Sequence, residues 1–398
     1  MTRRWKMGKA SLYLLPVAAC LLAACATYSQ SGRQEQPALP AKWKHGLPSD
    51  RNYFPIAVWL QSPANAAKYK ALGINLYVGL WKGPTEEQLK VLKEAGMPVI
   101  CDMNEEGLRH IATEKEPIIV GWMHGDEPDN AQSDGKGGYG PPILPSVIVE
   151  DYRKMVAKDP TRPVMLNLGQ GVAWDNWHGR GVRTNHPEDY PEYIKGGDII
   201  SFDIYPVAHS SKEVRNNLWY VAQGVERLVK WSEGKKIIWN CLECTHISSD
   251  QKATPKQMRA EAWMAVIKGS RGFIWFVHEF KPQFKEAAIL SDAVNSAAVA
   301  SINKEVSSLA AAINSPDVPV SVSVTNEAVP VAAVMKEEGG TKYIFAVGMR
   351  QGETQASFSV PAGTSTVEVI NESRSIAVKN GSFTDTFADY DVHLYRLK

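Results

Sequence analysis

Residues 85–103 read TEEQLKVLKEAGMPVICDM, and this stretch holds the unit from which we predict the fold. Thr85 is a typical N-cap, apolar residues then recur at the spacing of an α-helix, and Gly96 is typical of a helix end. A short apolar run follows at once in residues 97–103 and has the composition of a buried β-strand. The stretch therefore predicts a helix that leads directly into a strand.

The same alternation of apolar runs with polar or helical segments extends through residues 54–279. Strands that alternate with helices pair in parallel. Eight such units favour a closed (β/α)8 TIM barrel over an open doubly wound sheet, and no G-x-G-x-x-G motif follows the first strand to indicate a dinucleotide fold. The eight predicted strands are residues 54–60, 74–80, 97–103, 117–125, 163–169, 198–205, 236–243 and 272–279.

The C-terminal region has a different pattern. A long helical stretch at about residues 283–314 is followed by short alternating apolar runs, which Gly, Asn and Asp turns separate. We therefore predict a barrel domain, residues 50–314, and a small all-β antiparallel sandwich, residues 315–398. The runs lie at residues 319–324, 331–335, 343–347, 356–360, 366–370 and 393–397.

The composition of the chain limits its partners. Of 398 residues, 44 are Lys or Arg and 43 are Asp or Glu, and the basic residues form no cluster beyond the first nine. Because a nucleic-acid-binding protein needs a clustered basic excess, we expect no nucleic-acid partner. The sequence lacks a G-x-S-x-G elbow and an H-E-x-x-H motif, which disfavours serine and metal hydrolases, and we expect neither a metal nor a cofactor.

The first 25 residues have the pattern of an export signal. Four basic residues lie among the first nine, and the apolar run at residues 12–24 is too short for an ordinary membrane span. The run ends in Leu22-Ala23-Ala24-Cys25, which resembles the bacterial lipobox. The resemblance implies a lipoprotein signal peptide at residues 1–24 and an acylated Cys25 that anchors the protein to a membrane, facing the periplasm or the cell exterior. A plain signal peptide is the alternative, and residues 25–49 are predicted to form a flexible tether.

Three cysteines remain in the mature chain, Cys101, Cys241 and Cys244. An odd number cannot be fully paired, and the single C-x-x-C spacing of the last two is weak support for zinc. We predict buried thiols, with a disulfide that involves Cys101 or Cys244 as the alternative.

Carboxylates follow two of the predicted strands at the end that faces the mouth of a barrel, where catalytic side chains converge. The fourth strand ends in GWMHGDEPD, residues 121–129, and the seventh in IWNCLECT, residues 238–245. By the alternation of a β-strand, Glu127 lies on one face with Met123, and Glu243 on one face with Trp239. Both glutamates can therefore point into the mouth.

Two glutamates on opposite sides of a barrel mouth suit the cleavage of a glycosidic bond. One must stay protonated to assist the leaving oxygen, while the other stays ionised to attack or support the cation-like sugar carbon. Placing them on different strands gives each its own neighbours, which can raise one pKa and keep the other low. The alternative is that Glu127 and Glu243 are ordinary loop carboxylates.

These positions resemble the retaining glycoside hydrolases of the large (β/α)8 superfamily, whose catalytic glutamates end strands four and seven. The resemblance covers residues 50 to about 310 and implies a carbohydrate substrate, Glu127 as the acid/base and Glu243 as the nucleophile, with carboxyl groups roughly 5 to 5.5 Å apart. The family's usual Asn before the acid/base is Asp126 in this chain. The expected contact of that position with the sugar is therefore in doubt, and Asp126 is an alternative acid.

Further candidates lie at other strand ends and in the loop after the fifth strand. Asp203 and Tyr205 end the sixth strand, where the resembling enzymes often place a Tyr that hydrogen-bonds the nucleophile; a Tyr that only caps the core is the alternative. The remaining substrate-binding candidates are polar or aromatic residues that can bond sugar hydroxyls or stack on sugar rings: Asn167, Trp59, Trp275, His278, Trp174 and Trp177.

For the tryptophans the alternatives are structural. Trp174 and Trp177 lie in a Gly-rich loop and either stack on sugars or pin the loop down, and Trp275 either floors the subsite at the scissile bond or belongs to the barrel core. The sequence as a whole predicts a surface-anchored retaining glycosidase. A non-catalytic glycan-binding lipoprotein on the same barrel is the alternative, because a fold does not fix a function.

Overall fold

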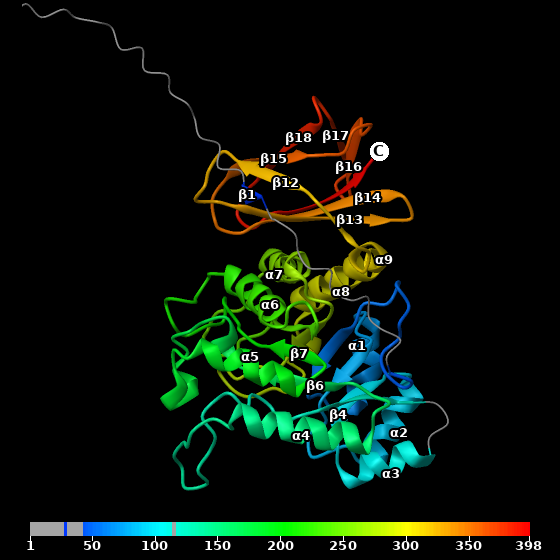
Figure 1. The fold of residues 1–398 in the computed structure, drawn as a ribbon, viewed down its shortest axis with the longest axis vertical. Helices are drawn as coiled ribbons and strands as arrows, with labels where there is room; N and C mark the ends of the chain where they lie inside the picture. Colours follow the sequence, from blue (N-terminus) through cyan, green and yellow to red (C-terminus); the bar gives the residue numbers. More distant parts are fainter. Residues whose placement is uncertain (1–27, 30–42, 114–116) are drawn as a thin grey trace, which may run out of the picture.

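The computed structural model describes residues 28–29, 43–113 and 117–398, so the predicted signal peptide and Cys25 lie outside the described residues. A parallel sheet forms the centre of the larger domain, and an all-β domain packs beside it (Figure 1). The strands of the parallel sheet are β2 (Ile56–Trp59), β3 (Leu76–Val78), β4 (Val99–Asp102), β5 (Ile119–Met123), β6 (Val164–Leu168), β7 (Ile199–Phe202), β8 (Ile237–Ile238), β9 (Asn240–Glu243) and β10 (Phe273–Phe276).

The sheet closes through its seventh strand, which is interrupted at Trp239 and so is divided into β8 and β9. The half before the interruption, β8, pairs with β7, and the half after it, β9, pairs with β10. Strand β10 also pairs with β2, the first strand, which completes the ring. The prediction of eight parallel strands in a TIM barrel followed by an all-β domain is therefore confirmed.

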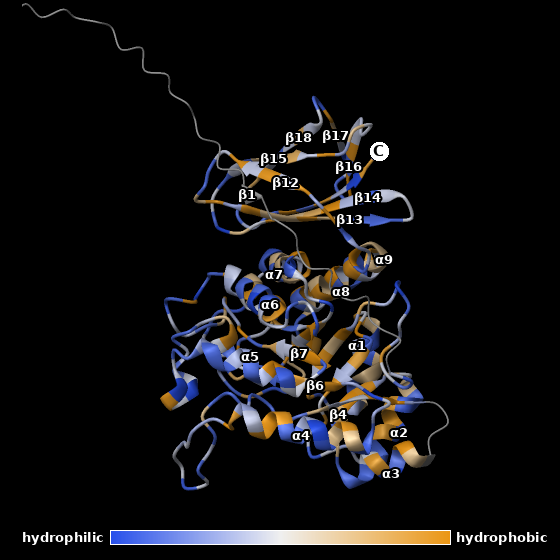
Figure 2. Cartoon of the chain, in the orientation of Figure 1, coloured by the Kyte–Doolittle hydropathy of each residue, from blue (hydrophilic) through white to orange (hydrophobic). Residues whose placement is uncertain are grey.

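Helices cover the outside of the barrel (Figure 1). In α2 (Glu86–Ala95), Thr85 forms the predicted capping box with Gln88, and Gly96 ends the helix with a φ of 59°. Figure 2 shows apolar strands inside and polar helix faces outside. The other helices are α1 (Ala66–Ala71), α3 (Glu105–Thr113), α4 (Pro145–Lys158), α5 (Tyr190–Tyr193), α6 (Trp219–Trp231), α7 (Pro255–Lys268), α8 (Ala293–Ser308) and α9 (Ala310–Ile313), and the 3-10 turns are η1 (Pro63–Asn65), η2 (Gln170–Val172), η3 (His178–Arg183), η4 (Pro187–Asp189), η5 (Ile194–Gly196) and η6 (Ala288–Ser291).

The side chains of the barrel strands form two apolar clusters, one inside the barrel and one between the strands and the helices. The inner cluster includes Val78, Ile100, Met165 and Trp239, while alternate strand residues pack outward against the helices. Only part of the predicted tether, residues 25–49, lies within the described residues. Trp43 packs against the inner cluster, as an apolar side chain this close to a barrel core should.

The C-terminal domain is an antiparallel sandwich of two sheets, in the orders β1-β12-β15-β18 and β11-β13-β14-β19-β16-β17. The runs recognised in the sequence correspond to strands, but β17 and β18 were missed because their alternation is weak and mostly polar. The strands are β1 (Tyr28–Ser29), β11 (Asp317–Val318), β12 (Ser321–Val324), β13 (Val331–Glu338), β14 (Thr341–Gly348), β15 (Thr354–Ser359), β16 (Thr366–Val369), β17 (Arg374–Ala377), β18 (Ser382–Phe387) and β19 (Val392–Leu397).

The sandwich and the barrel share a packed interface. One face of the larger sheet lies against α7, where the rings of Phe345 and Trp263 are 5.0 Å apart. The other face closes the sandwich core around Phe358 and Tyr395. Because the larger sheet buries both faces, the two domains form a continuous apolar contact.

Two sequence expectations concern the thiols and membrane spans. Cys101, Cys241 and Cys244 are buried and unpaired, which confirms the prediction of buried thiols. Within the described ranges, none of the helices combines the length and the apolar composition that a membrane crossing requires.

Candidate functional site

The segment that follows β5 places two adjacent acidic residues at the barrel mouth. Asp126 is exposed and Glu127 is partly exposed. Glu127 has a φ of 43°, a left-handed conformation that non-glycine residues adopt uncommonly and that concentrates at functional sites. The sharp turn at Glu127 breaks the strand alternation, so both carboxyl groups stay at the mouth.

The carboxyl group of Glu127 shares a hydrogen bond with that of Asp203, which follows β7. Burial raises the pKa of Glu127 well above its usual range, and the negative charge of Asp203 raises it further. Burial also raises the pKa of Asp203 to about 7, although the hydrogen bonds from Glu127 and from the Tyr205 hydroxyl oppose this. The pair therefore holds a proton close to neutral pH, and the pKa of Glu127 is raised well above its usual range.

Asp126 has a different environment. Surrounding protein atoms desolvate its carboxyl group, although the residue is open to the mouth, and this raises the pKa to about 6; a hydrogen bond of 2.9 Å from the Asn167 side-chain amide opposes that rise. The Asn167 carbonyl oxygen in turn accepts a 2.6 Å bond from the Ser201 hydroxyl, which fixes the orientation of the amide. Asp126 is thus predominantly ionised at neutral pH, and Asn167 holds it in place.

Glu127 is also supported by the loop after β6. The Asn130 amide donates to Glu127 Oε2 at 2.8 Å, and the Trp177 indole N–H donates to Asn130 Oδ1 at 2.9 Å. Trp174 is buried, and its ring lies 6.0 Å from that of Trp177. The prediction that both rings are open sugar platforms is therefore wrong for Trp174, which pins the loop, while Trp177 orients a contact of Glu127.

A buried ionic network that sequence patterns do not reveal joins the same two loops. Asp129 accepts hydrogen bonds of 2.9 Å from the Gly169 N–H and the Tyr190 hydroxyl. Arg180 donates to the Asp129 carbonyl oxygen and to Asp189. The bonded residues of this network are 9 to 61 positions apart along the chain, so no local sequence pattern predicts it.

Glu243 does not reach the mouth. Its side chain is 0% exposed, and its two carboxylate oxygens accept hydrogen bonds from the backbone N–H groups of Val207 and Ala208 at 2.6 and 2.7 Å. It also shares a hydrogen bond with Glu261 of α7, which is fully buried as well. The prediction that Glu243 presents its carboxyl group to a substrate is therefore wrong. The loop after β7 covers Glu243, and only the three-dimensional path of that loop could show this.

A large cavity of about 930 Å³ opens beside Asp126. Its wall comes from the ends of β10, β2 and β3 and from α2, and it includes three predicted residues, Trp59, Asp126 and His278. Two exposed rings complete the wall: Trp81, which ends the second predicted strand and can extend a sugar platform, is 68% exposed, and Phe284, which the sequence did not mark, is 61% exposed. Clefts of this size with an apolar wall and a few polar groups are typical ligand sites.

The structure also places Trp275 in the barrel core and not at a subsite. Its side chain is fully buried, and its indole N–H donates to Asn303 of α8 at 2.9 Å. Trp275 therefore points away from the barrel interior, whereas its neighbour Phe276 lines the cavity. Because successive strand residues alternate in direction, an error of one position exchanges a wall residue for a core residue.

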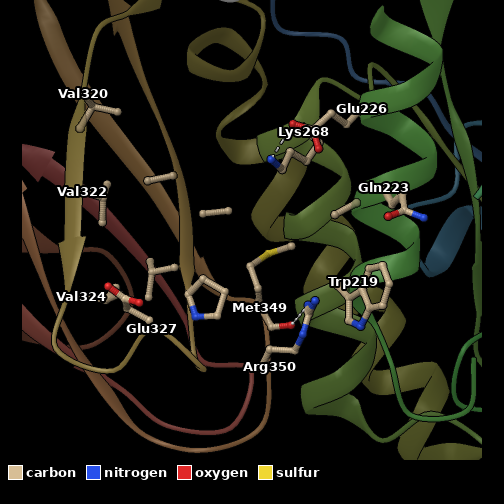
Figure 3. A pocket seen from close by; sticks show the side chains of 15 residues that line it. Trp219, Gln223, Glu226, Lys268, Val320, Val322, Val324, Glu327, Met349 and Arg350 are labelled. Carbon is tan, nitrogen blue, oxygen red and sulfur yellow. Dashed lines mark hydrogen bonds and ion pairs between the residues drawn. The ribbon is translucent and has the colours of Figure 1, made fainter. Parts of the chain in front are cut away.

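A second cavity, of about 410 Å³, lies between α6 and the sandwich. Figure 3 shows Trp219, Gln223 and Glu226 of α6 across it from Val320 and Val322. None of the predicted site residues lines it. In the described part of the chain, no group of three or more His, Cys, Asp or Glu side chains has the arrangement of a metal site.

Comparisons with known proteins find similarity in structure only. The sequence matches no protein-family model and no curated protein. An α-amylase from Geobacillus thermoleovorans, solved with acarbose, is similar with a TM-score of 0.53 at 10% identity, over 87% of this chain and 98% of that one. A GH30 endoxylanase from Clostridium papyrosolvens has a TM-score of 0.47 at 11% identity over 90% and 98%, and a putative α-galactosidase from Bacteroides fragilis 0.49 at 12% over 87% and 79%. The likeness to the amylase establishes a shared barrel fold.

Proposed function

We propose that this protein is a glycoside hydrolase that cleaves a poly- or oligosaccharide by double displacement, with Glu127 as the acid/base and Asp126 as the nucleophile. The observation that carries the proposal is the proton-sharing pair of Glu127 and Asp203 beside an aromatic cavity. A general acid must be protonated at neutral pH, which the raised pKa of Glu127 provides. The fold that the chain shares with a carbohydrate-active enzyme agrees with this assignment.

The proposed reaction has two steps. Glu127 gives its proton to the glycosidic oxygen while an Asp126 carboxylate oxygen bonds to the anomeric carbon, so the bond from that carbon to the leaving oxygen breaks. Glu127, now ionised, then takes a proton from water as the water oxygen attacks the anomeric carbon and releases Asp126. Asp126 lines the cavity and is predominantly ionised, which suits the role that the sequence assigned to Glu243.

A specific observation favours a second candidate, a glycan-binding protein without turnover. Glu243 at the end of β9 is covered, so this side of the mouth does not supply the carboxylate that the resembling enzymes use. A protein that only holds a glycan needs the aromatic cavity and not a paired acid and nucleophile.

Incubation with a panel of polysaccharides, with hydrolysis measured as the release of reducing ends, distinguishes the two functions. The proposal expects hydrolysis by the wild type, loss of it in Glu127→Gln and Asp126→Asn, and unchanged hydrolysis in Glu150→Gln, an exposed control on α4. Proton NMR of the first product should show a retained anomeric configuration. Binding without turnover in the wild type, or full activity in Glu127→Gln, would contradict it.

We also propose that a lipid on Cys25 anchors the protein to a membrane. Tyr28, three residues after Cys25, pairs with Val322 of the sandwich. Three residues span at most about 11 Å, so an anchored Cys25 would hold this sandwich edge close to the membrane surface. Cys25→Ala should abolish incorporation of labelled palmitate and move the protein from the membrane to the soluble fraction, whereas Cys20→Ala should not. Membrane retention of Cys25→Ala would contradict the anchor.

A further inference from the structure

The wall of the large cavity has an uneven distribution of charge. Three carboxylates line it, from Asp126 after β5, Glu87 on α2 and Glu286 after β10. Of the residues in the described ranges that line the cavity, none is Lys or Arg. The pair of Glu127 and Asp203 adds further negative charge at the mouth, because the charge of Asp203 interacts with that of Asp126.

Nearby cations do not offset this charge inside the cavity. Lys82 lies at the rim, with its ammonium 5.9 Å from the centre of the Trp81 ring. Lys285 is paired with Glu279 at 2.6 Å. Neither lines the cavity, so a ligand in it faces carboxylates and aromatic rings without a cationic partner.

Hydrogen bonds hold two of the three carboxylates in place: Asp126 accepts one from the Asn167 amide, and Glu286 is fixed from the other side of the cavity. Glu286 accepts a hydrogen bond of 2.5 Å from the Ser62 N–H, and its own carbonyl oxygen accepts one from Gln61. Gln61 in turn contacts the His278 ring, which also lines the cavity. A ligand that carries negative charge therefore meets positioned like charges, which cost several-fold to a hundredfold in affinity at short range.

We infer that the substrate is a glycan without carboxylate or sulfate groups, and that the cavity excludes anionic glycans by charge. This inference rests on the proposed function and names its substrate class. The aromatic wall binds the apolar faces of sugar rings whatever their charge, so it supplies affinity, while the carboxylates supply the selection.

The test compares one polysaccharide in two forms: the neutral polymer that the wild type hydrolyses best in the panel, and the same polymer after partial carboxymethylation. At 10 mM salt we expect kcat/KM on the carboxymethylated form to be at least about tenfold lower. In 500 mM NaCl the difference should shrink severalfold, because salt screens charge and does not relieve steric hindrance. Equal rates at low salt, or a difference that salt leaves unchanged, would overturn the inference.

A charge-reversal pair locates the effect in the cavity. Glu87→Lys should reduce the ratio of kcat/KM on the neutral polymer to kcat/KM on the carboxymethylated polymer about threefold or more. Glu94→Lys, on the same helix but outside the cavity, should leave this ratio unchanged. If Glu87→Lys leaves the difference unchanged, the cavity does not select by charge. If no polysaccharide is hydrolysed, the proposed function fails, and affinity electrophoresis in gels that contain neutral or carboxymethylated polymer still measures the charge preference.

Discussion

The carboxyl groups of Glu127 and Asp203 share a hydrogen bond across the barrel mouth, although β5 and β7 are separated by β6 in the sheet. The turn at Glu127, where φ is 43°, brings its side chain over β6 toward Asp203. Two partly buried carboxyl groups in contact cannot both ionise at low cost, so one keeps its proton. The pair therefore provides a protonated acid at neutral pH, which is the first requirement for cleaving a glycosidic bond.

Removal of the acid is the most direct test of this arrangement. Glu127→Gln keeps the shape of the side chain but cannot release a proton, so hydrolysis should fall about 10²- to 10⁴-fold. The rate of reducing-end release measures the effect, and a thermal melt shows whether the variant folds. The exposed Glu150→Gln should match the wild type in both measurements. A folded Glu127→Gln with wild-type activity would remove Glu127 from the chemistry.

The pH profile tests the interaction between Glu127 and Asp203. Burial and then the negative charge of Asp203 raise the pKa of Glu127, so loss of that charge in Asp203→Asn should lower the pKa. Activity depends on the protonated form, and it falls as pH rises through this pKa. The alkaline limb of kcat/KM should therefore move to lower pH in Asp203→Asn. An alkaline limb at the wild-type position would show that Asp203 does not control the acid.

Azide distinguishes Asp126 from Glu243 as the nucleophile. With an activated glycoside, azide should restore turnover to Asp126→Ala and give a glycosyl azide, because a small anion can occupy the space of the lost carboxylate. Glu243→Ala should give no such product, since Glu243 is fully buried beneath the loop at Val207. A glycosyl azide from Glu243→Ala alone would return the nucleophile role to Glu243.

The barrel was predictable because its signal is local and repeated. Each strand is a short apolar run, and caps such as Thr85 and Gly96 mark where the helices between them begin and end. The position of Glu127 at the mouth followed from the same pattern, because residues at the carboxyl ends of barrel strands converge.

The directions of individual side chains were less predictable. The alternation of the strand predicts that Glu243 points inward, but N–H groups of the loop after β7 donate hydrogen bonds to its carboxylate and the loop covers it. Trp275 can be placed at the mouth or in the core from the sequence. In the structure it points outward to Asn303, and its neighbour Phe276 points the other way. Trp81 and Phe284 come from loops, whose paths depend on distant contacts. Sequence periodicity therefore located the mouth and not the full set of side chains that line it.

The exposed aromatic wall should contribute to substrate binding more than to the chemical step. Trp81→Ala should raise KM severalfold and leave kcat close to that of the wild type, because stacking on a sugar away from the scissile bond stabilises ground and transition states equally. Trp219→Ala, in the separate cavity beside Arg350, is a matched control that should not change KM. If Trp81→Ala lowers kcat and kcat/KM equally, the ring acts at the reacting sugar instead.

The buried pair of Glu243 and Glu261 should make the stability of the protein depend on pH. Burial raises the pKa of Glu243 to about 7 and that of Glu261 well above its usual range. The unfolded chain releases these protons near the ordinary value of about 4.3, so above that pH the folded state binds more protons than the unfolded state. The contribution of the pair is therefore fully present below that value and is lost as pH rises through the raised pKa values.

Glu261→Gln isolates this contribution, because an amide can still donate to Glu243 but does not titrate. The free energy of unfolding, measured by denaturant titration at pH 5 and pH 8, should fall less with pH in the variant than in the wild type. The difference between the two proteins measures the stability that the proton on this pair contributes. The exposed Glu150→Gln should follow the wild-type curve. Parallel curves for Glu261→Gln and the wild type would mean that the pair does not hold a shared proton, and that Glu243 relies on the N–H groups of Val207 and Ala208 alone.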